Sequence, residues 1–158
     1  MTYDFNANEI LKMAEQIERN GYQFYTAAAE NVTDPRAKDF LSKLADMESK
    51  HEKYFASIRS QLSDQEKEMT VFDPDGEVEL YLRALADIRI FFEKKIDASS
   101  LEEILKAAIT AEKDSIVFYL GMKNTVPERL GRSKVDEIIE EEMRHITMLS
   151  EELLALKR

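Results

Sequence analysis

Hydrophobic side chains recur every three or four residues along most of the chain, and this spacing predicts long amphipathic helices. The first stripe begins after Asn6, a residue type that caps helices, and continues to Ala28. A second stripe begins after Asp34, where Pro35 suits a first helical turn, and continues to Leu62. The pattern therefore predicts two helices joined by a short connection.

The second half of the chain shows the same pattern. One stripe follows the capping residue Ser100 and extends to about Asn124, and another runs from about Ser133 to Leu156. Two long helices, a long connection and two further long helices are a standard arrangement of a four-helix bundle. We therefore predict an all-α four-helix bundle with a long crossover, forming a single domain over residues 1–158.

The long connection between the two halves has its own pattern. Residues 63–76 are polar and end in an Asp-Pro-Asp-Gly turn signal. A shorter apolar stripe follows, at Val78, Tyr81, Leu82, Leu85, Ile88 and Phe92. It predicts a short crossover helix whose apolar face packs on the bundle or on a second chain, and we favour a homodimer.

The composition narrows the possible functions. The chain carries a formal net charge of −10 and contains no cysteine. The acidity argues against binding to nucleic-acid phosphates or anionic membranes, and the lack of cysteine excludes disulfides, thiol catalysis and cysteine-ligated metals. No apolar run is long enough to span a membrane, and no signal peptide is visible. We expect a cytoplasmic protein that binds neither nucleic acid nor membrane.

The two halves align without gaps when the sequence is shifted by 94 residues, so that Glu9 meets Glu103. Eleven residues between positions 9 and 55 are then identical to their counterparts. The identical pairs include Glu18 with Glu112, Tyr25 with Tyr119, Glu48 with Glu142, and His51 with His145. A helical hairpin repeated once predicts a bundle with approximate internal two-fold symmetry.

Each half offers one glutamate on its first helix and a Glu-x-x-His motif on its second helix. Residues three apart share one face of a helix, so the glutamate and the histidine of each motif project together. All six residues lie in or beside the apolar stripes: Glu18, Glu48, His51, Glu112, Glu142 and His145. We predict that these side chains face one another inside the bundle.

Four carboxylates in one core would repel each other and lose hydration, at a cost on the order of several kcal/mol per uncompensated ion. Two divalent ions would neutralise them, and the two histidines can offer neutral nitrogen ligands. This donor set favours iron or manganese, and the helical motifs match those of di-iron and di-manganese bundles. We predict two iron ions, with manganese or zinc as substitutes. The alternative is an acidic bundle with hydrogen-bonded core histidines and solvated glutamates.

The expected roles of the six side chains follow from the symmetry. Glu48 and Glu142 can bridge the two metals, while Glu18 and Glu112 can be terminal ligands, with one histidine on each metal. Tyr25 and Tyr119 lie two turns beyond the terminal glutamates and could donate hydrogen bonds to ligand carboxylates, although ordinary core packing explains them equally well. The charge run before Glu142 leads us to expect that Glu140 and Glu141 are solvated.

These motifs resemble the rubrerythrin-like branch of the ferritin-like superfamily. The residues that carry the resemblance are Glu18 with Phe24-Tyr25, Glu48-x-x-His51, Glu112 with Phe118-Tyr119, and Glu142-x-x-His145. The resemblance covers residues 7 to 156. It implies a ferritin-like bundle and a non-haem di-iron oxidoreductase that reduces hydrogen peroxide in oxidative-stress defence, with the six side chains as catalytic metal ligands.

Two differences from rubrerythrins proper affect the expected activity. Those proteins carry a C-terminal rubredoxin domain with four cysteines, so here a separate donor, such as a rubredoxin-like protein, is expected to supply electrons. They also carry an additional glutamate one turn beyond the third-helix ligand, where this sequence has Ser115. Two alternatives with the same six ligands therefore stay open: a ferroxidase or iron-handling protein, and an oxidase that activates dioxygen rather than peroxide.

Overall fold

The structure, a computed structural model, describes residues 6–68, 77, 80–81, 84 and 100–157. The described residues contain no strand and four long helices: α1 (Ala7–Asn31), α2 (Pro35–Ser60), α5 (Leu101–Met122) and α6 (Arg132–Leu156). The all-α prediction is confirmed, and the expected ends of the long helices differ from the observed ones by no more than three residues.

Three of the long helices begin at the capping residues that the sequence indicates. The Asn6 side chain accepts a hydrogen bond from a backbone N–H of the first turn of α1, and Ser100 does the same for α5. Asp34 accepts from two backbone N–H groups at the start of α2, where Pro35 leaves no N–H to satisfy. These caps fix where each helix starts and therefore which face turns inward.

The helix α6 begins in a different way. Its preceding residue is Gly131, whose φ of 89° lies in the left-handed region that glycine adopts without a steric penalty. Two 3-10 turns, η1 (Lys123–Thr125) and η2 (Glu128–Leu130), lead into it from α5. The Tyr54 hydroxyl of α2 donates to the Gly131 carbonyl at 3.3 Å, which ties this turn to the first hairpin.

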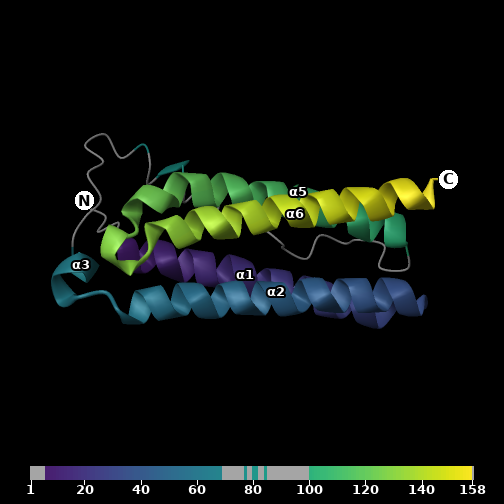
Figure 1. Cartoon of the computed structure of the whole chain (residues 1–158), viewed down its shortest axis with the longest axis horizontal. Coiled ribbons are helices and arrows are strands. Elements are labelled where there is room, and N and C mark those ends of the chain that lie inside the picture. Colours follow the sequence, from purple (N-terminus) through teal and green to yellow (C-terminus); the bar gives the residue numbers. More distant parts are fainter. Residues whose placement is uncertain (1–5, 69–76, 78–79, 82–83, 85–99, 158) are drawn as a thin grey trace.

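The four long helices lie side by side as two hairpins, α1 with α2 and α5 with α6 (Figure 1). The colours along the chain show that α2 ends and α5 begins at opposite ends of the bundle (Figure 1). The connection between them is therefore a crossover rather than a tight turn, as predicted. The helix α1 runs antiparallel to α5, and α2 runs antiparallel to α6.

Apolar side chains from all four helices fill the inside of the bundle. Among the most completely buried are Ile10, Leu11, Leu41, Leu44, Phe55, Ile104, Leu105 and Phe118. The Phe55 ring of α2 packs against Tyr119 of α5, with 5.2 Å between ring centroids. This contact joins the two hairpins next to the polar cluster described below.

The polar segment after α2 contains a short helix that the sequence analysis did not predict, α3 (Asp64–Glu68). Ser63 and Glu66 form its capping box, because the Ser63 hydroxyl accepts the Glu66 N–H and the Glu66 carboxylate accepts the Ser63 N–H. Arg129 of η2 donates to the Glu66 carboxylate and to the Gln61 carbonyl at 3.1 Å, which fastens α3 to the second hairpin.

The crossover helix lies mostly outside the described residues, and so do Val78, Leu82, Leu85, Ile88 and Phe92 of its predicted apolar stripe. Residues 77, 80, 81 and 84 are helical. None of the helices in the described ranges combines the length and the apolar composition that a membrane crossing requires.

Candidate metal centre

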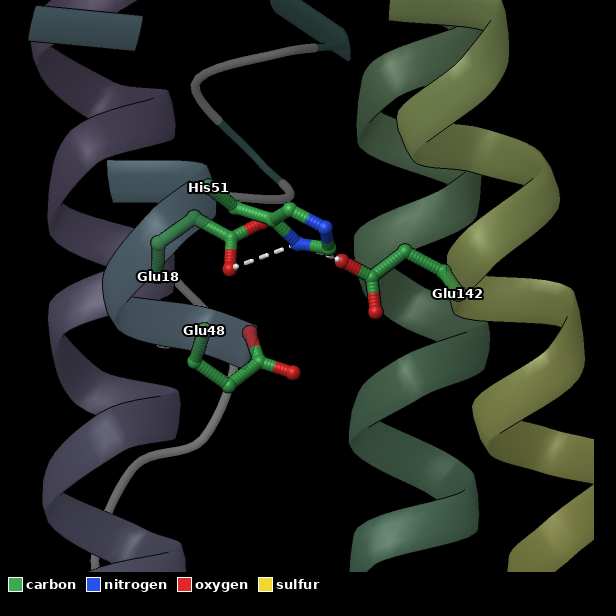
Figure 2. Close-up of side chains that lie close together, drawn as sticks. All are labelled: Glu18, Glu48, His51 and Glu142. Atoms are coloured by element: carbon green, nitrogen blue, oxygen red, sulfur yellow. Dashed lines mark ion pairs between the residues drawn. The ribbon is translucent and has the colours of Figure 1, made fainter. Parts of the chain in front are cut away.

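The structure brings all six predicted side chains together at mid-height in the bundle. The helix α1 contributes Glu18, α5 contributes Glu112, and α2 and α6 each contribute a Glu-x-x-His motif. Each of the six is buried, with no more than 4% of any residue exposed. Figure 2 shows Glu142 reaching from α6 towards His51, Glu18 and Glu48 on the first hairpin.

The six side chains form two overlapping groups of potential metal ligands. One group contains Glu18, Glu48, His51 and Glu142, and the other contains Glu48, Glu112, Glu142 and His145. Within each group the ligand atoms lie within 4.8 Å of one another. Glu48 and Glu142 belong to both groups, whereas each remaining glutamate and histidine belongs to one, so the geometry matches the predicted division into bridging and terminal ligands.

Both histidines turn the Nδ1 atom towards the carboxylates. The Nδ1 atom of His51 lies 2.8 Å from Glu142 Oε1 and 3.5 Å from Glu18 Oε2. The Nδ1 atom of His145 lies 3.1 Å from Glu142 Oε2, 3.3 Å from Glu112 Oε1 and 3.4 Å from Glu48 Oε1. The two rings are nearly parallel, with centroids 6.0 Å apart, so one imidazole serves each group.

The hydrogen bonds of the described residues leave much of this cluster unsatisfied. Buried atoms without a hydrogen-bond partner are Glu18 Oε2, Glu48 Oε1, Glu112 Oε2, both carboxylate oxygens of Glu142, His51 Nδ1 and His145 Nε2. Unpaired buried polar atoms are costly, and native proteins rarely leave them so. Because five of these atoms are carboxylate oxygens and two are imidazole nitrogens, all of them able to bind a metal, the cluster fits a di-metal centre.

Without metal, the buried carboxylates favour protons. Burial, together with the charge of Glu142, raises the pKa of Glu112 to about 8. The same two causes hold the pKa of Glu48 well above its ordinary value. Burial acts in the same direction on Glu142, but contacts with Glu112 and the two histidines outweigh it, and its pKa is lowered.

The two histidines respond to the same cluster. Burial acts to lower the pKa of His51, but its contacts with Glu142 and Glu18 dominate and raise it to about 12. For His145, burial again acts downward, while contacts with Glu112 and Glu142 raise the pKa to about 10. In the metal-free protein at neutral pH, protonated imidazoles and protonated carboxyls therefore supply the charge balance that two divalent cations would supply.

The two tyrosines bind the glutamates of the opposite half. Tyr25 of α1 donates to Glu112 Oε1 at 2.6 Å, and Tyr119 of α5 donates to Glu18 Oε1 at 2.5 Å. Burial and the neighbouring glutamates raise the pKa of both phenols, which keeps them protonated as donors. The predicted hydrogen bond to a ligand carboxylate is present, and each bond also joins α1 to α5.

Gly21 adjoins the cluster, and the sequence analysis did not single it out. It lies one turn after Glu18, and a Cβ at this position would meet Glu48 Oε2 at 3.0 Å. A glycine inside a helix costs about 1 kcal/mol relative to alanine. Its presence in the middle of a predicted helix could therefore have indicated that another side chain approaches the backbone there. Its counterpart Ser115 is buried and donates its hydroxyl to the Ala111 carbonyl at 2.9 Å.

Glu141 is solvated only in part: its side chain is 38% exposed, and it also makes a contact that the sequence analysis did not predict. Its Oε2 atom lies 2.5 Å from His51 Nε2, on the side of the ring that faces away from the carboxylate cluster. Consecutive residues of a helix point about 100° apart, so the residue before an inward glutamate can face the neighbouring helix. Glu140 is exposed, as expected.

A surface hollow of about 170 Å³ opens beside this contact. Its lining residues are His51, Tyr54, Lys134, Glu137, Ile138 and Glu141. The side chain of His51 is 6% exposed, whereas that of His145 is 0% exposed. The two histidine positions therefore differ in their access to solvent.

Comparison with known proteins agrees with this description. Residues 1–59 match the rubrerythrin family model. A solved structure from Thermotoga maritima, described as a ferritin-like diiron-carboxylate protein, is 25% identical, covers 97% of each chain and superposes with a TM-score of 0.72. None of the curated proteins gives a significant match. The ferritin-like fold and the rubrerythrin-like resemblance predicted from the sequence are thereby confirmed.

Proposed function

We propose that this protein is a di-iron oxidoreductase that reduces hydrogen peroxide with electrons from a separate donor. Glu18, Glu48, His51, Glu112, Glu142 and His145 would hold the two metals. The observation that carries the proposal is the pair of overlapping ligand groups, because two carboxylates common to both groups are what a paired metal centre requires. The proposal also draws on the similarity to the T. maritima protein described as diiron.

The donor set supports iron over metals that prefer thiolates. Four carboxylates and two imidazoles suit iron or manganese, and four negative charges balance two divalent cations. A bound iron pair supplies two electrons, which together with two protons convert one hydrogen peroxide into two waters. The separate donor then has to return two electrons for each peroxide that is consumed.

The chain's own residues would prepare the site for this chemistry. Glu48 and Glu142 would each be shared by the two metals at the junction of the two hairpins, and burial excludes bulk water. Tyr25 and Tyr119 each satisfy one oxygen of a terminal glutamate and leave the other oxygen unpaired for a metal. These hydrogen bonds fix the orientation of the terminal ligands before any metal is bound.

A ferroxidase or dioxygen-activating oxidase with the same ligands is the second candidate. The observation that favours it is Ser115, which stands where rubrerythrins proper have an additional glutamate. Its hydroxyl bonds back to the Ala111 carbonyl of its own helix. With the hydroxyl so engaged, this side chain replaces neither the charge nor the metal-binding capacity of a carboxylate.

The test is rapid mixing of anaerobic, Fe(II)-loaded protein with peroxide and, separately, with dioxygen. We expect faster oxidation by peroxide, slow but repeated turnover with an artificial electron donor, and a higher peroxide rate in Ser115→Glu. A preference for dioxygen in both proteins, or a single stoichiometric oxidation without turnover, would replace the peroxidase proposal with the oxidase or iron-handling alternative.

A further inference from the structure

We propose that Glu141 is a positioning residue that makes the two metal positions unequal, so that the position built on Glu18 and His51 binds its metal more tightly than the position built on Glu112 and His145. The inference rests on the proposed metal centre and adds to it an order of occupation. It follows from a polar contact at the Nε2 atom of His51 that has no counterpart at the Nε2 atom of His145 among the described residues.

The contact to His51 places the hydrogen of that ring. The carboxylate of Glu141 can only accept, so a neutral imidazole carries its proton on Nε2, 2.5 Å away. The Nδ1 atom then faces Glu142 Oε1 and Glu18 Oε2, which lie 2.8 and 3.5 Å away. A metal that replaces the proton on Nδ1 would therefore find His51 in the tautomer and orientation that a metal ligand needs.

His145 lacks this support. Its Nε2 atom is buried and has no hydrogen-bond partner among the described residues. The residue 94 positions before Glu141 is Met47, whose thioether is at best a weak acceptor. Metal-bound histidines usually donate the outer N–H to an acceptor, so metal at this position leaves a buried donor unpaired.

The tyrosine contacts and the shared glutamates are alike at the two positions, whereas His145 Nδ1 has an additional contact with Glu142 Oε2 of its own motif, at 3.1 Å. Each terminal glutamate accepts one tyrosine hydrogen bond, at 2.5 Å for Glu18 and 2.6 Å for Glu112. Glu48 and Glu142 belong to both ligand groups, and Glu141 belongs to neither. Glu141 can therefore act only through His51. An acceptor of this kind changes metal affinity about 10- to 100-fold, which sets the expected difference between the two positions.

A purely structural role for Glu141 predicts the opposite change. Suppose that the contact only stabilised protonated His51 in the metal-free protein. Removing the carboxylate would then make the proton on His51 easier for a metal to displace. Metal affinity would then rise. The direction of the change in affinity therefore separates positioning from structural support, whatever happens to folding stability.

The experiment titrates the metal-free, full-length protein with Co(II) and follows visible absorption and chelator competition. In the wild type we expect two binding steps that differ about 10- to 100-fold. The stronger step should be lost in Glu18→Ala and kept in Glu112→Ala. Glu141→Met, which copies Met47, should weaken the stronger step to the level of the weaker one, and Glu141→Gln, whose amide oxygen can still accept, should fall between.

Two further variants sharpen the test. Met47→Glu offers His145 the missing acceptor and should strengthen the weaker step. Glu140→Met removes the same charge from an exposed neighbouring position and should leave both steps unchanged. Urea unfolding of each metal-free variant separates lost binding from lost folding.

The Co(II) titration distinguishes failure of this inference from failure of the proposed metal centre. Absence of bound Co(II) in folded wild-type protein would overturn the metal centre and this inference with it. Two equal steps in the wild type, or a stronger first step in Glu141→Met, would overturn the inference alone and leave the metal centre standing.

Discussion

The first hairpin contains a partly buried ion pair at two positions where the second hairpin has hydrophobic residues. Arg59 of α2 donates to both oxygens of the buried Glu15 carboxylate on α1, at 2.5 and 3.1 Å. The residues 94 positions later are Ile109 and Leu153, which are partly buried and pack on the hydrophobic core. The same two positions of the hairpin are therefore occupied by an ion pair in the first half of the chain and by hydrophobic side chains in the second half.

Around the six potential metal ligands the two hairpins are far more alike. The six side chains and both tyrosines match across the repeat, and the tyrosine–glutamate bonds have nearly the same length. Differences begin just outside, with Gly21 against Ser115 and Met47 against Glu141. Two metals of one kind would require the same donors twice, whereas the residues around the donors can differ and can make the two positions unequal.

The largest expected effect separates bridging from terminal glutamates and is the same in both hairpins. Glu48→Ala and Glu142→Ala should each lose most of the roughly two metal ions expected per chain, because each carboxylate belongs to both groups of potential ligands. Glu18→Ala and Glu112→Ala should each lose about one ion. Metal analysis of protein prepared anaerobically without chelator measures this. Undiminished metal content in all four variants would show that these glutamates do not bind the metal.

The next largest effect is a difference between the metal-free and the metal-loaded protein in how folding stability depends on pH. The folded pKa values of Glu112 and His145, about 8 and 10, exceed the ordinary values of 4.5 and 6.5. Folding therefore takes up protons, so the metal-free protein should lose stability as pH rises from about 6 to 9, by up to about 1.4 kcal/mol per pH unit for each proton.

The metal-loaded protein should behave in the opposite way. Bound metal excludes protons from the ligands, while the unfolded chain binds protons on its histidines below about pH 6.5. Its stability should therefore rise with pH up to about 7 and then level off. Urea unfolding of both forms across this range measures the two slopes. Parallel curves for the two forms would contradict a metal–proton exchange in the cluster.

The six-residue cluster could be predicted because local rules determine it. The i, i+3 spacing puts Glu48 beside His51, the apolar stripes turn both inward, and the repeat supplies the partners. The tyrosine contacts needed more. Spacing along α1 suggested only that Tyr25 shares a face with Glu18, whereas the antiparallel packing of α1 on α5 places it against Glu112.

The contacts that the sequence analysis missed fall into two kinds. The capping box of α3 was visible as Ser63 followed by Glu66 and could have been found. The contact of Glu141 with His51 could not, because it depends on the rotation of α6 against α2. A run of three glutamates gives no sign of which member turns towards a neighbouring helix.

A smaller effect concerns the ion pair of the first hairpin. Arg59→Leu should destabilise the metal-free protein by about 2 kcal/mol, because the Glu15 carboxylate stays buried without its partner, although the partial exposure of Arg59 moderates the loss. Glu15→Ile with Arg59→Leu copies the second hairpin and should return stability to within about 1 kcal/mol of the wild type.

Arg19→Leu is the matched control for that pair. Arg19 contacts Glu52 at 2.7 Å but is about half exposed, so its removal should change stability by less than about 1 kcal/mol. Urea unfolding of the metal-free variants at neutral pH measures all three changes. A double variant as unstable as Arg59→Leu alone would show that the hydrophobic residues of the second hairpin do not pack in the same way in the first hairpin.

The smallest effect tests why the first hairpin has glycine where the second has serine. Gly21→Ala places a methyl group 3.0 Å from Glu48 Oε2 and 3.2 Å from its Cδ, so the carboxylate has to shift. Because alanine favours the helix by about 1 kcal/mol, metal-free stability should change little. Metal affinity should fall about tenfold at both positions, since Glu48 belongs to both ligand groups.

Ser115→Ala, which adds no atoms and removes only a hydroxyl bonded to its own helix, should leave affinity unchanged. Chelator competition with Co(II) measures both variants, and wild-type affinity in Gly21→Ala would show that the Glu48 carboxylate can move aside without loss of its bridging position.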